Sequence, residues 1–389
     1  MSHASIKNLE IEYLRAVSIG LVLLAHSPLL SPFVGEIILP LFQYLSLGVG
    51  VDLFFCISGF VVSRAYCDYF DRHAARGEFW PAARMFWLRR AYRLLPSAWF
   101  WVLVGLFCSL YFNSSGIFME PAQNLKSALA IASLSANVAH MYGALAPNNV
   151  YWSLSLEEQF YLLFPLFLLA ITARRWRIIA LLVVIAGQFF LSRNHFGDMT
   201  AQYLASFRID GFAWGILVHL FSRGALYRRL EPTWLARCRP AALAVTLLLV
   251  YLLTAVPARL GYLACHMGLM AMVAALLLWL ASYGNRYLFG YVGPGGLLGW
   301  LGSRSYGIYL IHLPAFKIVH EVAVRYLHAV DQPYGPELLP YLLLGALGLI
   351  GLLAEFNFRC IETPLRKRGA ARAQERLQAL EAQGAMHGA

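Results

Sequence analysis

The sequence predicts an all-α polytopic membrane protein, a bundle of ten transmembrane helices with a re-entrant or interfacial segment between the third and fourth. The 389 residues are 60% hydrophobic and only 13% charged, and the mean hydropathy is +0.60, whereas about a quarter of the residues in soluble domains are charged. Apolar runs of about 20 residues, enough to cross the hydrocarbon core, recur along the chain. Basic residues lie in the loops between these runs, so the net charge of +11 does not predict a nucleic-acid partner.

Ten segments have the length and composition of membrane spans, with edges defined to within a few residues. In chain order they are 11–30, 45–65, 94–112, 153–173, 177–192, 203–222, 240–257, 262–282, 303–322 and 338–357. The stretch LKSALAIASLSANVAHMYGAL at 125–145 is apolar but interrupted by polar side chains. An eleventh span there would move the basic RRWR at 174–177 to the outside, so we interpret 125–145 as the re-entrant or interfacial segment.

The basic residues predict the orientation of the bundle. Alternate loops collect them: Arg72, Arg76, Arg84, Arg89, Arg90 and Arg93; then Arg174, Arg175 and Arg177; then Arg223, Arg228, Arg229, Arg237 and Arg239; then Arg366, Lys367 and Arg368. The opposite loops carry little basic charge, for example Lys126, Arg193 and Arg259. The positive-inside rule therefore places both termini in the cytoplasm, with 1–365 as the transmembrane domain and 366–389 as a polar cytoplasmic tail.

Neither a metal site nor a secretory leader is expected. The six cysteines are scattered and form no CxxC pair, which supports neither a zinc site nor a disulfide framework. The first apolar run carries Arg15 and has no small-residue cleavage site before Pro28, so we expect it to remain as the first span.

Arg15 and His26 lie in this first span, eleven residues apart. Eleven residues of α-helix are about 20° past three turns, so both side chains share a face, roughly 16 Å apart along the axis. Ionisable groups at membrane depth are costly and usually functional. The alternative is a satisfied interior histidine with an arginine that reaches the headgroups.

Asp52, in GVGVDLFFCISGF, is expected at about the depth of His26. An Asp–His pair would orient the imidazole and raise its basicity. Alternatively, Asp52 pairs with another polar group and only holds helices together.

The fourth span opens with YWSLSLEEQFYLLFP. Ser153, Glu157 and Tyr161 recur at i, i+4 and i+8, which predicts a polar stripe on one helix face. Pro165 cannot donate to the carbonyl of Tyr161, which is left as an acceptor on that stripe. Counting from the outer edge puts Glu157 just inside the outer boundary.

The neighbouring Glu158 has a different expected role. Ser155 with Glu158 three residues later matches a capping box, which predicts that Glu158 lies at the helix end.

His26, Asp52 and Glu157 are expected to line one polar cavity in the outer half of the bundle. Glu157 is expected within about 15 Å of His26, which is half the hydrocarbon thickness.

Arg90 and Arg93, in WLRRAYRLLP, share a helix face where the third span leaves the cytoplasm. A forked arginine pair at a cytoplasmic mouth is suited to a polyphosphate ligand. The alternative is a positive-inside anchor, which we accept for Arg89.

Two later segments add polar groups at membrane depth. FRIDGFAWG carries Arg208 and Asp210, and its two glycines form a GxxxG that is more typical of helix packing than of a site. SRSYGIYLIHLP carries Tyr306, Tyr309 and His312, and its proline is expected to kink the helix.

Taken together in this order, the motifs resemble membrane acyltransferase family 3, the integral-membrane O-acyltransferases that modify bacterial surface glycans. The resemblance covers about residues 8–366. It rests on R-x10-H at Arg15 and His26, GVDLFF around Asp52, R-x-x-R at Arg90 and Arg93, WSLSLEEQFY with Glu157, SYGIYLIHLP, and IETP at 361–364.

The resemblance implies a ten-helix fold, no bound cofactor, and cytoplasmic acyl-CoA, usually acetyl-CoA, as the donor. It implies that His26 is the catalytic histidine, Arg15 its partner on the same helix, and Arg90 and Arg93 the ligands of the CoA phosphates. Some members carry a C-terminal periplasmic hydrolase-like domain. Since this chain ends in a short basic tail, one domain is expected to perform the whole transfer.

We therefore expect an O-acetyltransferase of the bacterial inner membrane that acts on a carbohydrate hydroxyl, free or lipid-linked, of a cell-surface polysaccharide such as lipopolysaccharide. Neutral His26 would be the general base, oriented by Asp52 or Glu157, in a direct transfer or a covalent acyl relay. The expected cavity lining is Trp152, Ser153, Tyr161, Arg208, Asp210, Tyr306 and His312.

Two alternatives remain at this stage. One is a proton-coupled transporter that uses the buried His, Asp, Glu and Arg groups as a relay, although the internal repeats common in transporters are not seen. The other is a catalytically inactive glycan-binding member of the same family.

Overall fold

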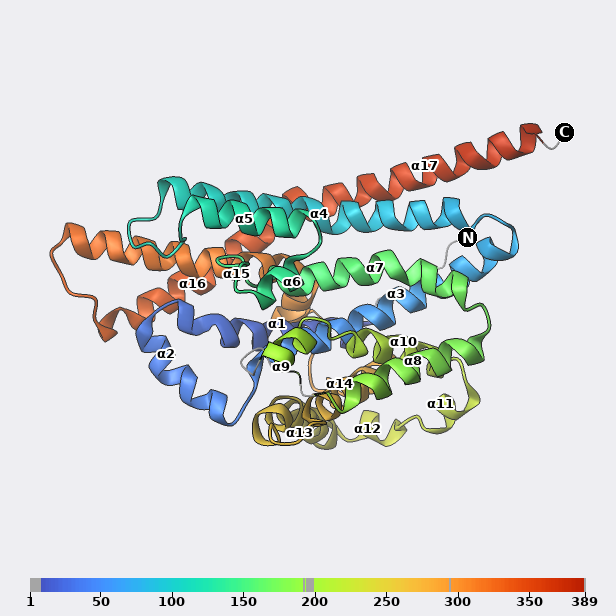
Figure 1. Ribbon diagram of the computed structural model, residues 1–389. Helices are drawn as coiled ribbons and strands as arrows, with labels where there is room; N and C mark the ends of the chain where they lie inside the picture. The colour runs from blue at the N-terminus through green and yellow to red at the C-terminus, as the bar shows by residue number, and fades with distance from the viewer. Residues whose placement is uncertain (1–7, 192, 194–198, 294, 388–389) are drawn as a thin grey trace. The chain divides into compact units, whose positions relative to one another are not determined.

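The computed structural model describes residues 8–191, 193, 199–293 and 295–387, and every regular element among them is helical (Figure 1). Seven helical stretches are long and apolar enough to cross a membrane: Leu47–Ala75, Phe79–Tyr111, Tyr151–Ala170, Tyr203–Ser222, Arg239–Arg259, Gly296–Ala329 and Pro336–Leu377. The all-helical membrane architecture is thereby confirmed. The count of ten spans is not, because the helices that cover 11–30, 177–192 and 262–282 do not belong to these seven.

The described chain forms two compact units. One is built from the described parts of Met1–Pro28, Gly35–Arg64 and Arg174–Ser305, and the other from Leu29–Val34, Ala65–Ala173 and Tyr306–Ala389. Two of the boundaries fall inside long helices, α3 (Gly50–Ala75) and α15 (Gly296–Ala329).

The first unit contains α1 (Leu9–His26), α8 (Arg174–Phe189), α9 (Met199–Ala205), α10 (Asp210–Ser222), α11 (Ala225–Arg229), α12 (Thr233–Arg237), α13 (Arg239–Arg259) and α14 (His266–Ser282). Helix α1 begins at Asn8, whose side-chain oxygen accepts the N–H groups of Glu10 and Ile11, as preferred N-cap residues do. The core of this unit is aliphatic, and Leu14, Leu53 and Leu253 are fully buried in it. Helices α13 and α14 pack side by side (Figure 1).

Glycines allow α3 and α10 to cross closely in this unit. A Cβ atom on Gly215 would lie 2.1 Å from the carbonyl oxygen of Cys56, and one on Gly59 would lie 2.3 Å from that of Phe212. A Cβ on Gly211 would meet the Phe55 side chain at 3.0 Å. The prediction that the GxxxG of FRIDGFAWG is a packing face is confirmed.

The second unit contains α4 (Phe79–Tyr111), α5 (Pro121–Ala132), α6 (Ala136–Met141), α7 (Tyr151–Ala170), α16 (Leu339–Phe356) and α17 (Thr363–His387). A short helix, α2 (Pro32–Ile38), precedes α3 in the chain. Helix α17, which includes the predicted polar tail, packs along α4 (Figure 1). Gly369 allows this approach, since its Cβ would lie 2.4 Å from that of Tyr92, and Arg372 donates to the Tyr92 hydroxyl.

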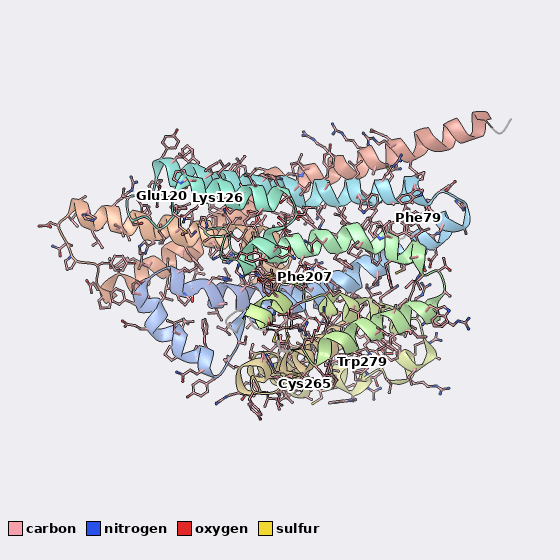
Figure 2. All side chains as sticks on the ribbon, in the orientation of Figure 1. Phe79, Glu120, Lys126, Phe207, Cys265 and Trp279 are labelled. Atoms are coloured by element: carbon pink, nitrogen blue, oxygen red, sulfur yellow. The ribbon has the colours of Figure 1, made fainter. Side chains whose placement is uncertain are left out.

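The segment between α4 and α7 contains no helix of spanning length within residues 112–150, all of which are described. It folds into α5, with Glu120 at its start (Figure 2), and the six-residue α6. Twelve residues of α-helix are about 18 Å long, well short of a hydrocarbon core of about 30 Å. Helix α5 packs against α4, and the Asn124 side chain donates to the carbonyl of Phe118, so the segment is tied to the unit by its own polar groups.

The IETP motif adopts a less common conformation. Asn357–Glu362 form a π-helix that joins α16 to α17. Pro364 has no N–H to donate to the carbonyl of Cys360, which weakens the α-helical pattern at this point. π-helical turns are frequently found at functional sites.

Candidate functional site

The polar stripe predicted on α7 is present. The Tyr161 hydroxyl donates to the Glu157 carboxylate at 2.5 Å. One turn nearer the start of the helix, the Ser153 hydroxyl lies 2.6 Å from that of Tyr309, which also donates to the carbonyl of Val150 at 2.9 Å. The stripe thus links α7 to α15 through hydroxyl groups.

The carbonyl of Tyr161, to which Pro165 cannot donate, accepts a hydrogen bond from another group, as predicted. The indole N–H of Trp87 donates to the Tyr161 carbonyl at 3.1 Å. A tryptophan of α4 therefore takes the place of the backbone donor that proline removes, and it fixes α4 against α7 at this level.

The predicted capping box of Ser155 and Glu158 is wrong. Helix α7 begins at Tyr151, with Val150 as its N-cap and no side-chain capping bond, so Ser155 and Glu158 lie inside the helix. The Ser155 hydroxyl accepts the N–H of Ala136, and Glu158 is only 9% exposed. Residues before the predicted start are helical because Trp152 and Ser153 are buried against the unit.

Arg90 lies in a cage of aromatic rings. Its guanidinium carbon is 4.9 Å from the ring centre of Tyr161 and 5.4 Å from those of Tyr66 and Phe86. The residue is 8% exposed, and its Nε–H has no hydrogen-bond acceptor in the described part of the chain. Cation–π contacts hold the charge in place but leave the guanidinium donors available to an anion.

Arg93 lies on the same face of α4 and within electrostatic reach of Glu157 and Glu362. The structure therefore brings the predicted phosphate ligands, Arg90 and Arg93, together with the predicted catalytic Glu157. Sequence reasoning missed the cage. Phe86 precedes Arg90 by four residues and was visible in the spacing, but Tyr66 and Tyr161 come from other helices.

This proximity contradicts the prediction that Glu157 and the Arg90–Arg93 pair lie at opposite ends of their spans. Helices α4 and α7 are antiparallel, because Trp87 bonds to Tyr161 while the Tyr151 hydroxyl donates to the carbonyl of Ala98 at 3.1 Å. Glu157 is therefore level with the Arg90–Arg93 turn. The prediction assumed that α4 and α7 end at the same level, whereas α4 continues past the start of α7 and packs there against α5.

The remaining residues predicted to line the cavity in this unit are anchored by short-range bonds. The Tyr306 hydroxyl donates to the carbonyl of Leu94 at 2.6 Å, which keeps it on the arginine-bearing part of α4. The His312 Nδ1 lies 3.3 Å from the carbonyl of Ile308 on its own helix, and the Trp152 ring stacks on His140. Pro314 lies inside α15, which continues through it.

In the other unit, His26 is the last residue of α1. Its Nδ1 lies 2.9 Å from the carbonyl of Val22. A carbonyl can only accept, so Nδ1 carries the proton and the lone pair of neutral His26 is on Nε2. Arg15, on the same helix, forms an ion pair with Glu12 at 3.0 Å.

Asp52, Arg208, Asp210 and Arg193 form two buried ion pairs in this unit. Arg208 donates to Asp52 at 3.1 Å, and Arg193 binds both carboxylate oxygens of Asp210 at 2.7 Å. Arg193 was expected to be a loop charge, but it is 2% exposed. No sequence spacing links it to Asp210.

The carboxylate of Asp52 is thus paired with an arginine, as the helix-holding alternative requires. Whether Asp52 or Glu157 orients His26 stays a prediction, and so does the distance between His26 and Glu157, since these two residues belong to different units.

Comparison with known proteins identifies relatives across most of the chain. A family model described as an acyltransferase domain matches residues 8–354. The peptidoglycan O-acetyltransferase OatA of Listeria monocytogenes is 29% identical over 346 residues, 82% of this chain and 51% of that protein. The putative peptidoglycan O-acetyltransferase YrhL of Bacillus subtilis is 25% identical over 82% of this chain and 51% of its own length.

A third relative, the O-acetyltransferase OatA of Staphylococcus aureus, is 26% identical over 84% of this chain and 54% of its own length. The chain therefore spans about half the length of the curated relatives it matches. No solved structure matches it.

Proposed function

The chain belongs to membrane acyltransferase family 3, and from this we propose that it is a membrane O-acetyltransferase that transfers an acetyl group from cytoplasmic acetyl-CoA to a glycan hydroxyl. The observation that carries the proposal is the Arg90 cage. A buried guanidinium with available donors, beside a second arginine and a carboxylate, is suited to a phosphate-bearing donor.

The proposed reaction uses His26 as the general base. Its Nε2 removes the proton from the acceptor hydroxyl while the oxygen attacks the thioester carbonyl. The C–S bond then breaks, and the proton on Nε2 passes to the departing CoA thiolate. The hydrogen bond from Nδ1 to Val22 supports this role, because it holds the ring in the tautomer that has its lone pair on Nε2.

A covalent relay is the second route. It would place the acetyl group on a protein side chain before the acceptor receives it. A transient acetylated protein, trapped by rapid acid quench and detected by mass spectrometry, would identify the relay, whereas direct transfer leaves the protein unmodified.

The proposed topology has ten spans, with both termini in the cytoplasm and 125–145 as the re-entrant or interfacial segment of an inner-membrane protein. The short α5 and α6 and the basic loops that the sequence places on one side support it.

The proposed acceptor is a carbohydrate of the cell surface, free or lipid-linked. Two of the relatives are named for peptidoglycan, which favours a peptidoglycan hydroxyl over lipopolysaccharide as the first acceptor to test.

The deciding experiment follows acetyl transfer from radiolabelled acetyl-CoA in proteoliposomes, with mass spectrometry of the host's surface glycans with and without the gene. Label in the glycan that requires the protein supports the proposal. If no acetyl group moves and the proteoliposomes instead conduct protons, the transporter alternative replaces it.

A further inference from the structure

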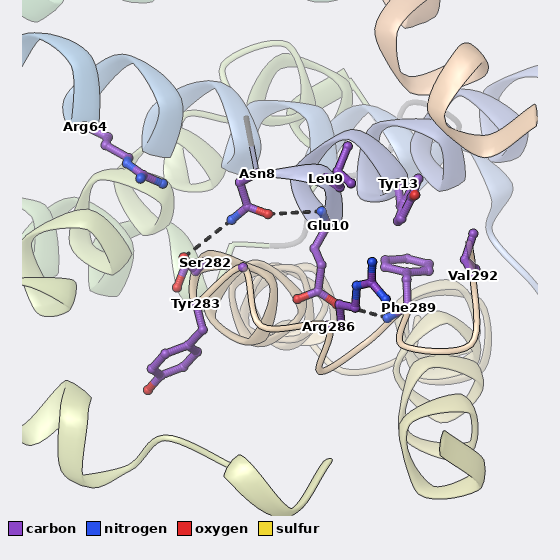
Figure 3. A pocket seen from close by; sticks show the side chains of 11 residues that line it. Asn8, Leu9, Glu10, Tyr13, Arg64, Ser282, Tyr283, Arg286, Phe289 and Val292 are labelled. Atoms are coloured by element: carbon purple, nitrogen blue, oxygen red, sulfur yellow. Dashed lines mark hydrogen bonds between the residues drawn. The ribbon is translucent and has the colours of Figure 1, made fainter. Parts of the chain in front are cut away.

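A polar cavity that the proposed mechanism does not use lies at the start of α1, within the first unit (Figure 3). Its volume is about 290 Å³, close to the lower end for small-ligand sites. Its lining comes from the start of α1, from α3, and from the end of α14 with the segment after it, and includes Asn8, Glu10, Tyr13, Arg64, Arg286 and Phe289.

The cavity carries an excess of positive charge. Arg64 enters it from α3 and Arg286 from the segment after α14 (Figure 3). Neither guanidinium forms a hydrogen bond or an ion pair with the described residues; Arg64 has one ring contact, at 6.0 Å from the centre of Phe60, and Arg286 has an electrostatic attraction to Glu10. The cavity lining thus includes two arginines and one carboxylate, and up to ten N–H donors remain for anions.

In this cavity, only one of the two carboxylate oxygens of Glu10 has hydrogen-bond donors. It is 2% exposed, and its Oε1 accepts the N–H groups of Leu288 and Phe289 at 2.8 and 3.0 Å. Its Oε2 is buried and has no donor in the described part of the chain. A ligand that places a hydroxyl or amine on Oε2 and an anionic group on a lining guanidinium would satisfy both kinds of atom.

The backbone around the cavity is fixed on both sides. The Asn8 amide donates to the carbonyl of Ala281 at 2.8 Å, and the Tyr13 hydroxyl donates to that of Gly293 at 3.0 Å. Arg286 itself has a φ of +60°, a conformation that non-glycine residues adopt only when the surroundings hold them in it. The guanidinium of Arg286 therefore projects from an ordered turn.

We propose that this cavity binds a phosphate group and that, given the proposed function on which this assignment rests, the phosphate belongs to the nucleotide of acyl-CoA. CoA carries phosphates at two places, and this cavity is assigned only one of them. The adenine amine or ribose hydroxyl supplies the donor that Glu10 Oε2 lacks.

The length of α1 agrees with this assignment. Thirteen residues separate Tyr13 from His26 on α1, roughly 20 Å at about 1.5 Å per residue. The pantetheine arm and diphosphate of CoA, extended like about five residues of backbone, cover roughly 17 Å. Glu10 lies sixteen residues before His26, roughly 24 Å, so the thioester of a nucleotide held there extends along most of α1 and ends between one and two turns before His26.

An anionic lipid headgroup offers the same phosphate chemistry, so the test has two arms. The full-length protein in detergent is titrated with CoA and, as a phosphate-free probe, with pantetheine. The same protein is tested for binding to phosphatidylcholine vesicles with and without phosphatidylglycerol. The variant is Arg64→Gln/Arg286→Gln, and the matched control is Arg228→Gln, an exposed arginine outside the cavity.

We expect the double variant to raise the Kd for CoA at least tenfold, which is about 1.4 kcal/mol, with pantetheine binding unchanged and the control within twofold of wild type. Loss of the preference for phosphatidylglycerol with unchanged CoA binding would keep the phosphate site and assign it to lipid. Unchanged binding in both arms overturns the proposal.

Two further readouts keep the outcome interpretable. If wild type binds no CoA, the proposed donor fails, while the vesicle arm still decides the phosphate site. A thermal unfolding scan of each variant detects misfolding, and if the double variant is unfolded, the single variants Arg64→Gln and Arg286→Gln carry the same test.

Discussion

At the scale of single residues, the predicted site residues have specific partners within their own units. In one unit, the Nδ1 of His26 lies against the carbonyl of Val22. In the other, Glu157 accepts from Tyr161, and aromatic rings surround Arg90. These partners orient the groups whose proposed roles the following predictions test.

The first prediction concerns His26. Replacement by alanine removes the proposed base, so acetyl transfer should fall by about 10²–10⁴-fold, the usual contribution of general-base catalysis. The measurement is label transfer in proteoliposomes, normalised to the amount of protein in the membrane. Transfer at the wild-type rate by His26→Ala would falsify the mechanism.

The second prediction concerns Glu157. Glu157→Gln keeps the shape but removes the charge beside Arg93, and the rate should fall at least tenfold, on the scale of one acid–base contribution. Glu337→Gln makes the same chemical change at an exposed loop residue and should leave the rate within twofold. Glu158 no longer serves as the silent control, because it is buried in α7 and not a capping residue. Equal rates for wild type and Glu157→Gln would reduce the stripe to a packing feature.

The third prediction concerns Arg90 and Arg93. Lysine keeps the charge but lacks the planar fork and stacks less well on the rings of the cage. The double variant Arg90→Lys/Arg93→Lys should raise KM for acetyl-CoA with a smaller change in kcat, measured by initial rates over a range of donor concentrations. An unchanged KM would mean that Arg90 and Arg93 do not bind the donor and serve only as positive-inside anchors.

At the scale of elements, close helix crossings explain why several small or imino residues occur where they do. Gly59, Gly211 and Gly215 let α3 approach α10, and this crossing brings Asp52 within bonding distance of Arg208. In the other unit, Pro165 frees the carbonyl that Trp87 then occupies. Packing residues thus set the geometry of nearby charged side chains.

The fourth prediction tests the α3–α10 crossing. In Gly215→Ala the added Cβ would lie 2.1 and 2.6 Å from backbone atoms of Cys56 and Phe60, which cannot move independently. Such overpacking costs about 1–3 kcal/mol, so the apparent Tm in detergent should fall by several degrees. Gly187→Ala is the control, because nothing lies within 4 Å of its Cβ and alanine is favoured over glycine in a helix by about 1 kcal/mol. Equal Tm values for the two variants would contradict the crossing.

At the scale of the whole molecule, the fifth prediction tests the proposed topology. A cysteine introduced at Ser115 should react with a membrane-impermeant maleimide added to intact cells, whereas one at Arg175 should react only after the membrane is opened. The reason is that in the proposed topology α5 and α6 do not cross the membrane, so that α7 would run from the outside inward. Labelling at Arg175 from outside would mean that 125–145 spans the membrane and that the orientation of α7 is reversed.

The sequence by itself determined the all-helical membrane class, seven of the ten predicted spans as helices long and apolar enough to cross a membrane, the polar stripe of α7 and the packing role of the GxxxG glycines. These features depend on local periodicity and on residue types whose chemistry acts within one helix: apolar runs, i and i+4 spacing, and the missing N–H of proline.

Only the tertiary structure decided which groups from different helices meet. It placed Glu157 level with Arg90 and Arg93, paired Asp52 with Arg208 and Arg193 with Asp210, and moved the start of α7 ahead of the capping box. Depth counted along a single helix assumes that every span starts at the same boundary. The way α5 packs along α4 breaks that assumption, because helix ends are set by what packs beside them and not by the chain's own hydropathy.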